Sequence, residues 1–396
     1  MKVQIGGEAD GSWPTSADMA TRPTPPVPAG FPSQLADRAF VYIRPDKMPT
    51  VLPYVDARWS GIVMAGRRGT VKAVRELVAL GVGFPVLIDP EAYRHHTATV
   101  DDPFWLPSDG LFTPTLEAVV VGQLHAGASA ALTPTGYIPA GGTDELKAAT
   151  SQFAQLGNDL AILVVPLDIS LLGGSYFKHT CAILEDFERP VAMVLVCQGN
   201  PLNQRKDIIP NLRTLARRVP LIPLRTDFNG LDLLGQGALF TAIGTGGSLR
   251  HAVDPGEQGE SFVPGAAPSV LWPELLSFYK GSTIAEFFGA QEHLAPACGC
   301  GVCRGRRITR FLRHEHQDEA IAHGVAVWSP SAGRVLSAAT VRERAETWKS
   351  MCAQAVAEYH MVLDRLQRLD GLRLQPSLER WATLPASPTS APAPVA

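Results

Sequence analysis

Short, nearly continuous runs of Val, Ile, Leu and Ala recur along the chain and alternate with longer segments of mixed polarity. Apolar runs of this kind are typical of parallel strands that are buried on both faces. We expect eight such strands, at residues 61–65, 85–89, 130–134, 161–168, 191–198, 219–227, 239–244 and 269–272. An additional opening strand is expected at residues 40–43.

The segments between these runs are long enough to form crossover helices, for example at residues 71–80, 143–156 and 208–218. Eight strand–helix units in one chain favour a (βα)8 barrel of the TIM type over an open, doubly wound sheet. No Gly-x-Gly-x-x-Gly pattern follows the first strand, which weighs against a dinucleotide-binding fold. The pattern therefore predicts an α/β barrel.

Three cysteines, Cys298, Cys300 and Cys303, fall within six residues and have glycines between them. A tight turn can bring three thiolates onto one ion, and sulfur together with imidazole suits Zn²⁺ in a closed tetrahedron. A disulfide is the alternative, but cysteines separated by a single residue bridge poorly. We therefore expect a structural zinc site.

The fourth ligand of this site is expected among the histidines that follow. His314 and His316 lie early in an expected helix over residues 308–322, whereas His323 stands at its end, just before Gly324. A chain reversal at that point could return His323 to the cysteines. We expect His323 to complete the site, with His316 as the next candidate.

Composition divides the chain into four parts. Residues 1–35 are rich in Pro, Gly, Ser and Thr and are expected to be disordered, and residues 375–396 form a Pro- and Ala-rich tail. The barrel is expected over residues 36–290, and a zinc-binding subdomain with closing helices is expected over residues 291–374.

The 396 residues are 45% hydrophobic and 18% charged, which is enough for a large buried core. The net charge of −3 gives no overall signature of nucleic-acid binding, so any polyanion site must be a local patch. The other cysteines, Cys181, Cys197 and Cys352, are scattered, which suits a reducing cytoplasm. The sequence shows neither a membrane span nor a signal-peptide pattern, so we expect a cytoplasmic protein without membrane contact.

Polar residues stand at the ends of several expected strands, namely Asp89, Asp168, Gln198 and Asp227. Because catalytic groups of barrels gather where strands end, we expect these side chains at one rim. Neighbouring carboxylates can hold different pKa values, so one can attack while another exchanges protons. Gln198 can both donate and accept at the edge of a heterocycle. The alternative for each acid is a helix cap or a solvated turn.

A glycine-rich stretch, residues 244–251, follows the expected seventh strand. Barrels often bind phosphate on backbone N–H groups at this position. An ordinary turn before a helix is the alternative. The stretch is therefore a candidate contact for a phosphate or a sugar phosphate.

Together these features resemble the tRNA-guanine transglycosylase superfamily. Its members exchange guanine in a nucleic acid for a 7-deazaguanine through a covalent sugar–enzyme intermediate. The resemblance extends from about Gly61 to a closing helix at residues 340–369 and is most specific at the cysteines. It implies a zinc ion as cofactor, and a nucleic acid and a 7-deazaguanine base as partners.

The resemblance also implies roles for the rim residues. Asp89 would take part in proton transfer, and Asp168, Gln198 and Gly199 would bind the purine edge. A carboxylate would attack C1′ of a guanosine that has left its stack, and guanine would depart. The incoming base would then attack the glycosyl–enzyme ester.

The sequence departs from the family at three places. Residues 90–92 and 225–227 replace glycine-containing motifs, and the last expected strand at 269–272 carries no aspartate where the tRNA enzymes have their nucleophile. These departures, with the gap of twenty residues between Cys303 and His323, resemble the divergent branch that modifies DNA. The resemblance therefore slightly favours DNA over tRNA as the substrate.

Asp227 is the expected nucleophile, because it ends a strand at the rim and Arg225 beside it could keep it ionised. Glu274, which follows the last expected strand, is the alternative. A basic run beside the cysteines is expected to contact phosphates, unless it is a solvated helix face. It contains Arg304, Arg306, Arg307, Arg310 and Arg313.

Two other classes of protein stay open. One is a zinc-stabilised barrel enzyme whose glycine-rich loop grips a small phosphorylated substrate. The other is a non-catalytic, transglycosylase-like binding subunit. Nucleic-acid binding at low salt would separate the first class from the expected function, and a guanine-exchange assay would separate the second. A homodimer and a complex with a partner subunit are both open.

Overall fold

The computed structural model describes residues 28, 30–106, 113–257, 265–368 and 371–387. Eight of its strands are parallel: β1 (Ala39–Ile43), β2 (Ile62–Ala65), β3 (Val86–Asp89), β4 (Ala131–Leu132), β5 (Ala161–Asp168), β6 (Val191–Val196), β7 (Leu221–Pro223) and β8 (Thr241–Gly244). They form two four-stranded sheets, with the orders β3-β2-β1-β8 and β4-β5-β6-β7. The α/β fold with parallel sheets that the sequence predicts is confirmed.

The two sheets meet at both of their edges. Between β3 and β4, the amide of Ser129 donates to the carbonyl oxygen of Val86 at 2.8 Å. Beyond the end of β7, the amide of Thr226 donates to the carbonyl oxygen of Ala242 in β8 at 3.0 Å. Since β8 also pairs with β1, strands that follow one another in the chain are neighbours in space.

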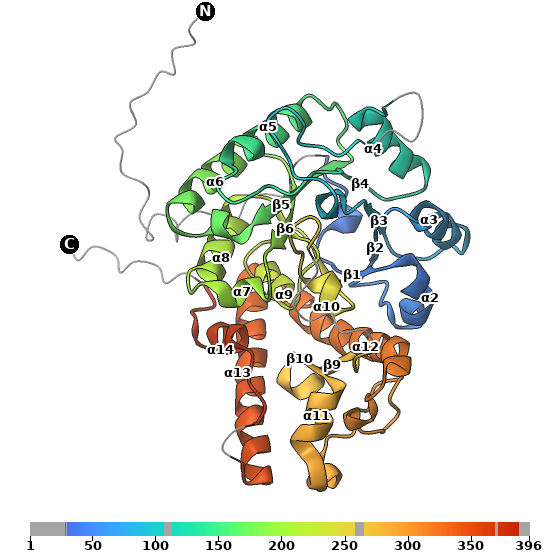
Figure 1. Ribbon diagram of the computed structural model, residues 1–396, viewed down its shortest axis with the longest axis vertical. Coiled ribbons are helices and arrows are strands. Elements are labelled where there is room, and N and C mark those ends of the chain that lie inside the picture. The colour runs from blue at the N-terminus through green and yellow to red at the C-terminus, as the bar shows by residue number, and fades with distance from the viewer. Residues whose placement is uncertain (1–27, 29, 107–112, 258–264, 369–370, 388–396) are drawn as a thin grey trace, which may run out of the picture.

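The helices that follow the strands lie around the outside of the sheets (Figure 1). The longer ones are α3 (Thr70–Ala79), α4 (Leu116–His125), α5 (Thr143–Ala154), α6 (Gly174–Phe187) and α8 (Ile208–Arg218). Short helices lie at α2 (Met48–Val51), α7 (Pro201–Gln204), α9 (Asn229–Leu234) and α10 (Gly247–Arg250). The three crossover helices predicted from the sequence correspond to α3, α5 and α8. In α8, Ile208, Leu212 and Leu215 are buried, which is the spacing of a single helix face.

The first and last predicted strands have different places from those expected. Residues 40–43, predicted as an extra strand, belong to β1, which lies between β2 and β8. Residues 269–272, predicted as the last parallel strand, form β9 (Ser269–Trp272), which pairs antiparallel with β10 (Ser277–Lys280). A short apolar run looks the same in both settings, because a hairpin buried against helices needs the same side chains as a parallel strand.

The C-terminal elements lie to one side of the parallel sheets (Figure 1). They are α11 (Gly281–Phe288), α12 (Gln317–Leu336), α13 (Val341–Leu366) and α14 (Pro376–Thr383). One core of buried side chains joins the β9–β10 hairpin to α11, to the cysteines and to α13, and it includes Val270, Phe287 and Cys303. The boundary at residues 290/291 that the sequence predicts falls inside this core.

The segment before α12 differs from the prediction. Residues 308–322 do not form one helix; short 3-10 turns at Ile308–Arg310 and His314–His316 precede α12. His323 therefore lies inside α12 rather than at a helix end. Gly324 suggested that end, but Val325 and Trp328 are buried beyond it, and their packing outweighs the low helix propensity of glycine. The predicted closing helix is confirmed as α13.

The predicted terminal segments are only partly described. Ser33–Leu35 form a 3-10 turn in which Leu35 is buried. Of residues 1–32, only 28 and 30–32 are among the described residues. The predicted tail contains α14, because its Trp381 packs on Trp348 of α13 with ring centroids 5.5 Å apart. Across the described ranges, every helix is too short or too polar to cross a lipid bilayer.

A buried ion pair ties α8 to α9 and to the segment after α14. Arg213 donates to both carboxylate oxygens of Asp232, from Nε at 2.8 Å and from Nη2 at 2.6 Å. Its Nη1 donates to the carbonyl oxygen of Pro385 at 2.8 Å. Both side chains are buried, so each charge depends on the other for compensation.

We expect the substitution Asp232→Ala to lower the free energy of unfolding by about 3–5 kcal/mol, because it leaves a buried guanidinium unpaired. Glu346→Ala is the matched control, since it removes an exposed pair with Arg342 and should cost less than about 1 kcal/mol. Urea denaturation measures both values. Equal costs for the two variants would contradict the role assigned to the Arg213–Asp232 pair.

Candidate functional site

Cys298, Cys300, Cys303 and His323 come together in a group that could bind a metal ion. The three Sγ atoms lie 3.7, 3.5 and 3.3 Å from Nδ1 of His323, and all four ligand atoms lie within 4.8 Å of one another. A tetrahedral ion bound to sulfur and nitrogen would set such separations at about 3.6 Å. The residues therefore fit a four-coordinate metal, as the sequence predicts.

Backbone hydrogen bonds close the turn that carries the cysteines. The amide of Cys298 donates to the carbonyl oxygen of Arg306 at 3.0 Å, and the amide of Arg304 donates to that of Cys300 at 2.9 Å. The chain reverses at Arg304 and Gly305, where φ is 51° and 84°. The left-handed backbone at these two residues turns the chain back on itself, so that the sulfurs face one point.

His323 reaches the cysteines from the second turn of α12 and is fully buried. Its Nε2 lies 2.7 Å from the carbonyl oxygen of Leu271, so Nε2 carries the proton and donates. This leaves Nδ1 as the ligand atom, because the outer hydrogen bond of a ligating histidine fixes its tautomer. His316 lies outside this group, and its Nδ1 accepts a hydrogen bond from the amide of Arg313 at 3.3 Å.

Asp89, the predicted proton-transfer residue, is buried at the end of β3, with 1% of its surface exposed. Its Oδ2 accepts hydrogen bonds from the hydroxyls of Tyr42 at 2.7 Å and Tyr93 at 2.9 Å, and its Oδ1 accepts from the amide of Glu91 at 2.9 Å. Burial and the charge of Glu91 raise the pKa of Asp89, and these hydrogen bonds oppose the rise. Asp89 therefore lies in a buried network, with two tyrosine hydroxyls at Oδ2 and a backbone amide at Oδ1.

Glu91 and Arg225 form the charged centre of this network. Arg225 donates from Nη1 to Oε1 of Glu91 at 2.9 Å and to the hydroxyl of Tyr93 at 3.2 Å. Its Nη2 donates to the carbonyl oxygen of Ser248 at 2.6 Å. Arg44 also pairs with Glu91. The loops after β1, β3, β7 and β8 are thereby joined through a single carboxylate.

Arg225 does not stand beside Asp227 in the way the sequence suggested. Its φ of 52° is left-handed, and its guanidinium pairs with Glu91 instead. The cation that shares a cavity with Asp227 is Arg250. Arg250 is therefore the arginine that lines the same cavity as Asp227.

Asp168, at the end of β5, belongs to a second group of acids. Its Oδ2 accepts from the hydroxyl of Tyr137 at 2.9 Å, and its Oδ1 accepts from the amide of Ser170 at 2.9 Å. Tyr137 also shares a hydrogen bond with Asp254. Burial, together with the charges of Glu257 and Asp168, raises the pKa of Asp254. The sequence does not predict Asp254 and Glu257 as site residues, because the loop that carries them has no distinctive sequence motif.

Gln198 follows β6 and is partly buried. Its Nε2 donates to the carboxylate of Glu257, while its Oε1 is buried without a hydrogen-bond partner among the described residues. A buried amide oxygen in this state can accept a hydrogen bond from a ligand. Gly199 beside it has a φ of 75°, which allows the chain to turn away from the strand end.

Asp227 follows β7 and lines a cavity of about 200 Å³. The cavity lies between the loops after β6, β7 and β8, the β9–β10 hairpin and α14, and its lining includes Asn200, Phe278 and Trp381. Oδ1 of Asp227 accepts from the amide of Asn229 at 2.8 Å, at the start of α9. Asp227 thus anchors a turn and also faces a cavity.

Arg250 and His251 share this cavity with Asp227. Arg250 is 7% exposed, its Nη2 donates to Oγ of Ser269 at 2.8 Å, and its Nη1 is buried without a partner among the described residues. Burial lowers the pKa of Arg250 to about 10, and Asp227 opposes this change. Burial also lowers the pKa of His251 to about 4, again against the effect of Asp227. At neutral pH the cavity therefore presents a cation and a neutral imidazole.

The two other predicted sites are Glu274 and the glycine-rich stretch at residues 244–251. Glu274, the alternative nucleophile, is exposed on the turn Pro273–Leu275 between β9 and β10, outside the parallel sheets. The glycine-rich stretch forms the end of β8 and the short helix α10. A Cβ at Gly244 would lie 2.1 Å from the carbonyl oxygen of Leu249, so this close approach requires glycine. A phosphate contact on this stretch stays a prediction.

The arginines near the cysteines are partly neutralised. Arg306 and Arg310 both pair with Glu319, at 2.6 and 2.5 Å. Arg304 and Arg307 are exposed and donate to backbone carbonyl oxygens. Residues 298–313 contain no acid, but α12 brings the carboxylate of Glu319 to the run from outside that segment.

Comparisons with known proteins add little to this description. No protein-family profile matches the chain, and no curated protein matches it. Among solved structures, an orotidine 5′-phosphate decarboxylase from Lactobacillus acidophilus matches 52% of this chain and 90% of its own, with 9% identity and a TM-score of 0.31. So slight a likeness supports no conclusion about activity.

We expect the purified protein to carry about one metal ion per chain, and Cys300→Ser to lose it. The variant should also unfold at a lower temperature, because a structural metal contributes directly to the free energy of folding. His323→Ala should lose metal as well, while His316→Ala serves as the control and should retain it. Metal analysis of the three variants tests this order, and loss of metal from His316→Ala alone would reassign the ligand.

We expect His251 to make the folded state less stable at acidic pH. Its pKa is 6.5 in the unfolded chain and about 4 in the fold, so its stabilising contribution is complete above pH 6.5 and is lost as the pH falls towards 4. Over this range the wild type should lose up to about 3 kcal/mol more free energy of unfolding than His251→Gln. Denaturation curves that change in parallel with pH would contradict this expectation.

Proposed function

We propose that the protein is a base-exchange transglycosylase that replaces guanine in a nucleic acid with a 7-deazaguanine, with DNA slightly favoured over tRNA. The observation that carries the proposal is the three-cysteine, one-histidine group beside the β9–β10 hairpin, in a chain whose parallel strands are followed by acids at their carboxyl ends. We infer that the eight parallel strands act as one (βα)8 barrel, since consecutive strands are neighbours and β8 returns to β1.

In this proposal the metal is Zn²⁺. Three sulfurs and one imidazole form a soft, closed donor set, which is the usual composition of structural zinc sites. Bound zinc would supply structural cross-linking rather than a reactive position. Through His323 and Leu271 the ion would fix α12 to the β9–β10 hairpin. The hairpin in turn forms one wall of the cavity that Asp227 lines.

Asp227 is proposed as the nucleophile. Its carboxylate oxygen would form a bond to C1′ of the flipped-out nucleotide as the bond from C1′ to the guanine nitrogen breaks, and guanine would leave with the electron pair. The incoming base would then attack C1′, and the ester bond to Asp227 would break. The cationic guanidinium of Arg250 in the same cavity would stabilise the negative charge that develops on the departing group.

Proton transfer and base recognition are assigned to the other strand ends. The departing guanine needs one proton and the incoming base loses one. The Asp89 carboxyl could exchange these protons through the hydroxyl of Tyr42 or Tyr93. Asp168 and Gln198 follow neighbouring strands, and the unpartnered Oε1 of Gln198 could accept a hydrogen bond from the purine edge. These roles are consistent with the positions of the residues.

We expect wild-type protein, incubated with a guanine-containing DNA strand or tRNA in the absence of an incoming base, to form an adduct that survives denaturation. Asp227→Asn should form none, because its amide is a poor nucleophile. Glu274→Gln is the control and should form the adduct at the wild-type level. Denaturing gel electrophoresis of labelled nucleic acid measures the adduct.

Other outcomes of this experiment would exclude the assignment. An adduct with Asp227→Asn but not with Glu274→Gln would move the nucleophile to the hairpin. Labelled guanine exchange, run on DNA and tRNA in parallel, identifies the polymer. No exchange on either, together with tight binding, would favour the non-catalytic binding subunit.

A further inference from the structure

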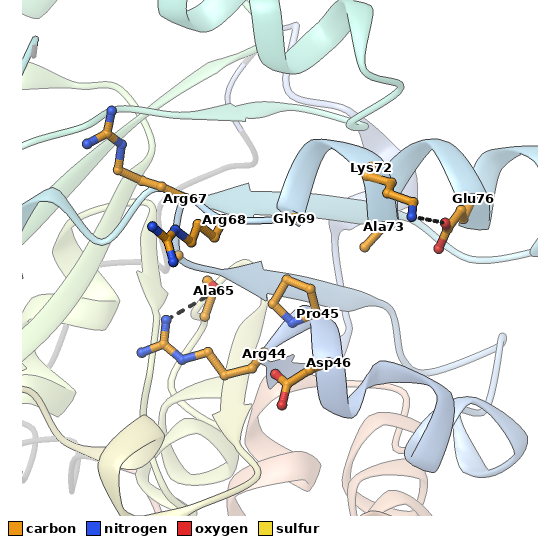
Figure 2. A pocket seen from close by; sticks show the side chains of 11 residues that line it. Arg44, Pro45, Asp46, Ala65, Arg67, Arg68, Gly69, Lys72, Ala73 and Glu76 are labelled. Atoms are coloured by element: carbon orange, nitrogen blue, oxygen red, sulfur yellow. Dashed lines mark hydrogen bonds and ion pairs between the residues drawn. The ribbon is translucent and has the colours of Figure 1, made fainter. Parts of the chain in front are cut away.

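Arginines follow each of the three consecutive parallel strands β1, β2 and β3 at their carboxyl ends. Arg44 follows β1, Arg67 and Arg68 follow β2, and Arg94 follows β3 in the chain. Figure 2 shows the guanidinium groups of Arg44, Arg67 and Arg68 on the same side of one opening. Because parallel strands end at one edge, loops that are separated in sequence place like charges together here.

Arg44, Arg67 and Arg68 line a cleft of about 540 Å³ between the end of β1 and the start of α3. Lys72 contributes a further cation, and Asp46 and Glu76 are the acids in the lining. A depression of about 590 Å³, lined partly by the same residues, continues along α3 to Arg75. The cleft is therefore elongated, as an extended ligand would require.

The positive charge on this surface exceeds the negative charge that opposes it. Glu91 accepts Arg44 and Arg225 and lies 3.7 Å from Arg94, so one carboxylate serves three guanidinium groups. Arg68 is exposed and has no ion-pair partner among the described residues. By contrast, Glu319 offsets Arg306 and Arg310 beside the cysteines. Lys72 pairs with Glu76 at 3.8 Å, so Arg68 is the clearest uncompensated charge on the strand-end surface.

Aromatic rings lie directly beside these cations. The guanidinium carbon of Arg67 lies 4.6 Å from the centroid of the Trp105 ring, and His95 lies 5.1 Å from Trp105 between ring centroids. Trp105 is partly exposed and His95 is exposed. Cations that follow a phosphate backbone, combined with rings on which bases stack, are the two components of single-stranded nucleic-acid binding.

We propose that this surface, the basic rim, binds the phosphodiester backbone next to the target nucleotide; it consists of Arg44, Arg67, Arg68, Lys72 and Arg94. Trp105 and His95 would stack on a neighbouring unpaired base. The inference rests on the proposed function and specifies where the polymer lies. Arg44 contacts Glu91, whose amide donates to Asp89, so phosphates on the rim would lie next to the ends of the strands that carry the proposed chemistry.

The test measures binding of a fluorescein-labelled, guanine-containing single-stranded DNA and of tRNA by anisotropy over a series of salt concentrations. The double variant Arg67→Ala/Arg68→Ala should bind at least about 10-fold more weakly at low salt, and its log–log salt slope should fall by about 1–2. Both side chains are exposed, so the fold should be retained, which a thermal melt verifies.

Two further double variants make the comparison specific. Arg342→Ala/Arg365→Ala removes the same charge from the exposed face of α13 and should leave the slope unchanged. Arg304→Ala/Arg307→Ala tests the surface beside the cysteines and should change the slope less than the rim variant does. Trp105→Leu should weaken binding of the single strand without changing the slope, because stacking releases no counterions.

The outcomes separate this inference from the proposed function. If wild type binds and the rim variant keeps its affinity and slope, the rim is not the polymer site, while the transglycosylase proposal stands. If inorganic phosphate at low millimolar concentration displaces the DNA completely, the rim is a small-anion site and the inference fails. If wild type binds neither polymer at low salt, the inference and the proposed function both fail.

Discussion

The buried ion pair between Glu91 and Arg225 holds the carboxyl ends of the parallel strands together. The side chains of Glu91 and Arg225 are 2% and 4% exposed, so both charges are removed from water. The free energy of this desolvation can exceed the gain from their mutual attraction. The hydroxyl of Tyr93, the carbonyl oxygen of Ser248 and the guanidinium of Arg44 supply further partners, while Nε of Arg225 is buried without one among the described residues. The proposed role of Asp89 depends on that compensation, because the amide of Glu91 and the hydroxyl of Tyr93 both donate to its carboxylate.

The second constraint is the group of cysteines with His323. It stabilises a part of the molecule whose core is separate from that of the sheets. The hydrogen bond from His323 to Leu271 connects this group to the hairpin, and the hairpin borders the Asp227 cavity. A metal ion bound to this group would therefore support one wall of the Asp227 cavity without lining it.

The sequence predicted features that are encoded locally. The cysteines lie within six residues, so their convergence needs only one turn, and the strands of the parallel sheets are continuous apolar runs. The Glu91–Arg225 pair is separated by 134 positions, and no local pattern indicates a contact at that distance. For the same reason Glu319, which offsets Arg306 and Arg310, could not be assigned to them before α12 was placed.

Ambiguous local signals account for the other differences. The run at residues 269–272 could be a parallel strand or one arm of a buried hairpin, and Gly324 could be a helix end or a helix interior. Tertiary packing decides both cases, through the buried side chains of Val270 and Trp328. Residue type and position predicted Asp227 at a strand end, but the neighbouring cation depends on how a left-handed residue directs its side chain.

The position of helix α14 near the end of the chain affects the order in which the fold is completed during synthesis. Its residues Leu378 and Trp381 form a wall of the cavity that contains Asp227, although they follow every parallel strand in the chain. A ribosome synthesises this wall after all the proposed catalytic side chains and after the metal ligands. A nascent chain that has already folded its sheets would therefore hold an open, solvent-filled groove at Asp227 until α14 emerges and docks on α13.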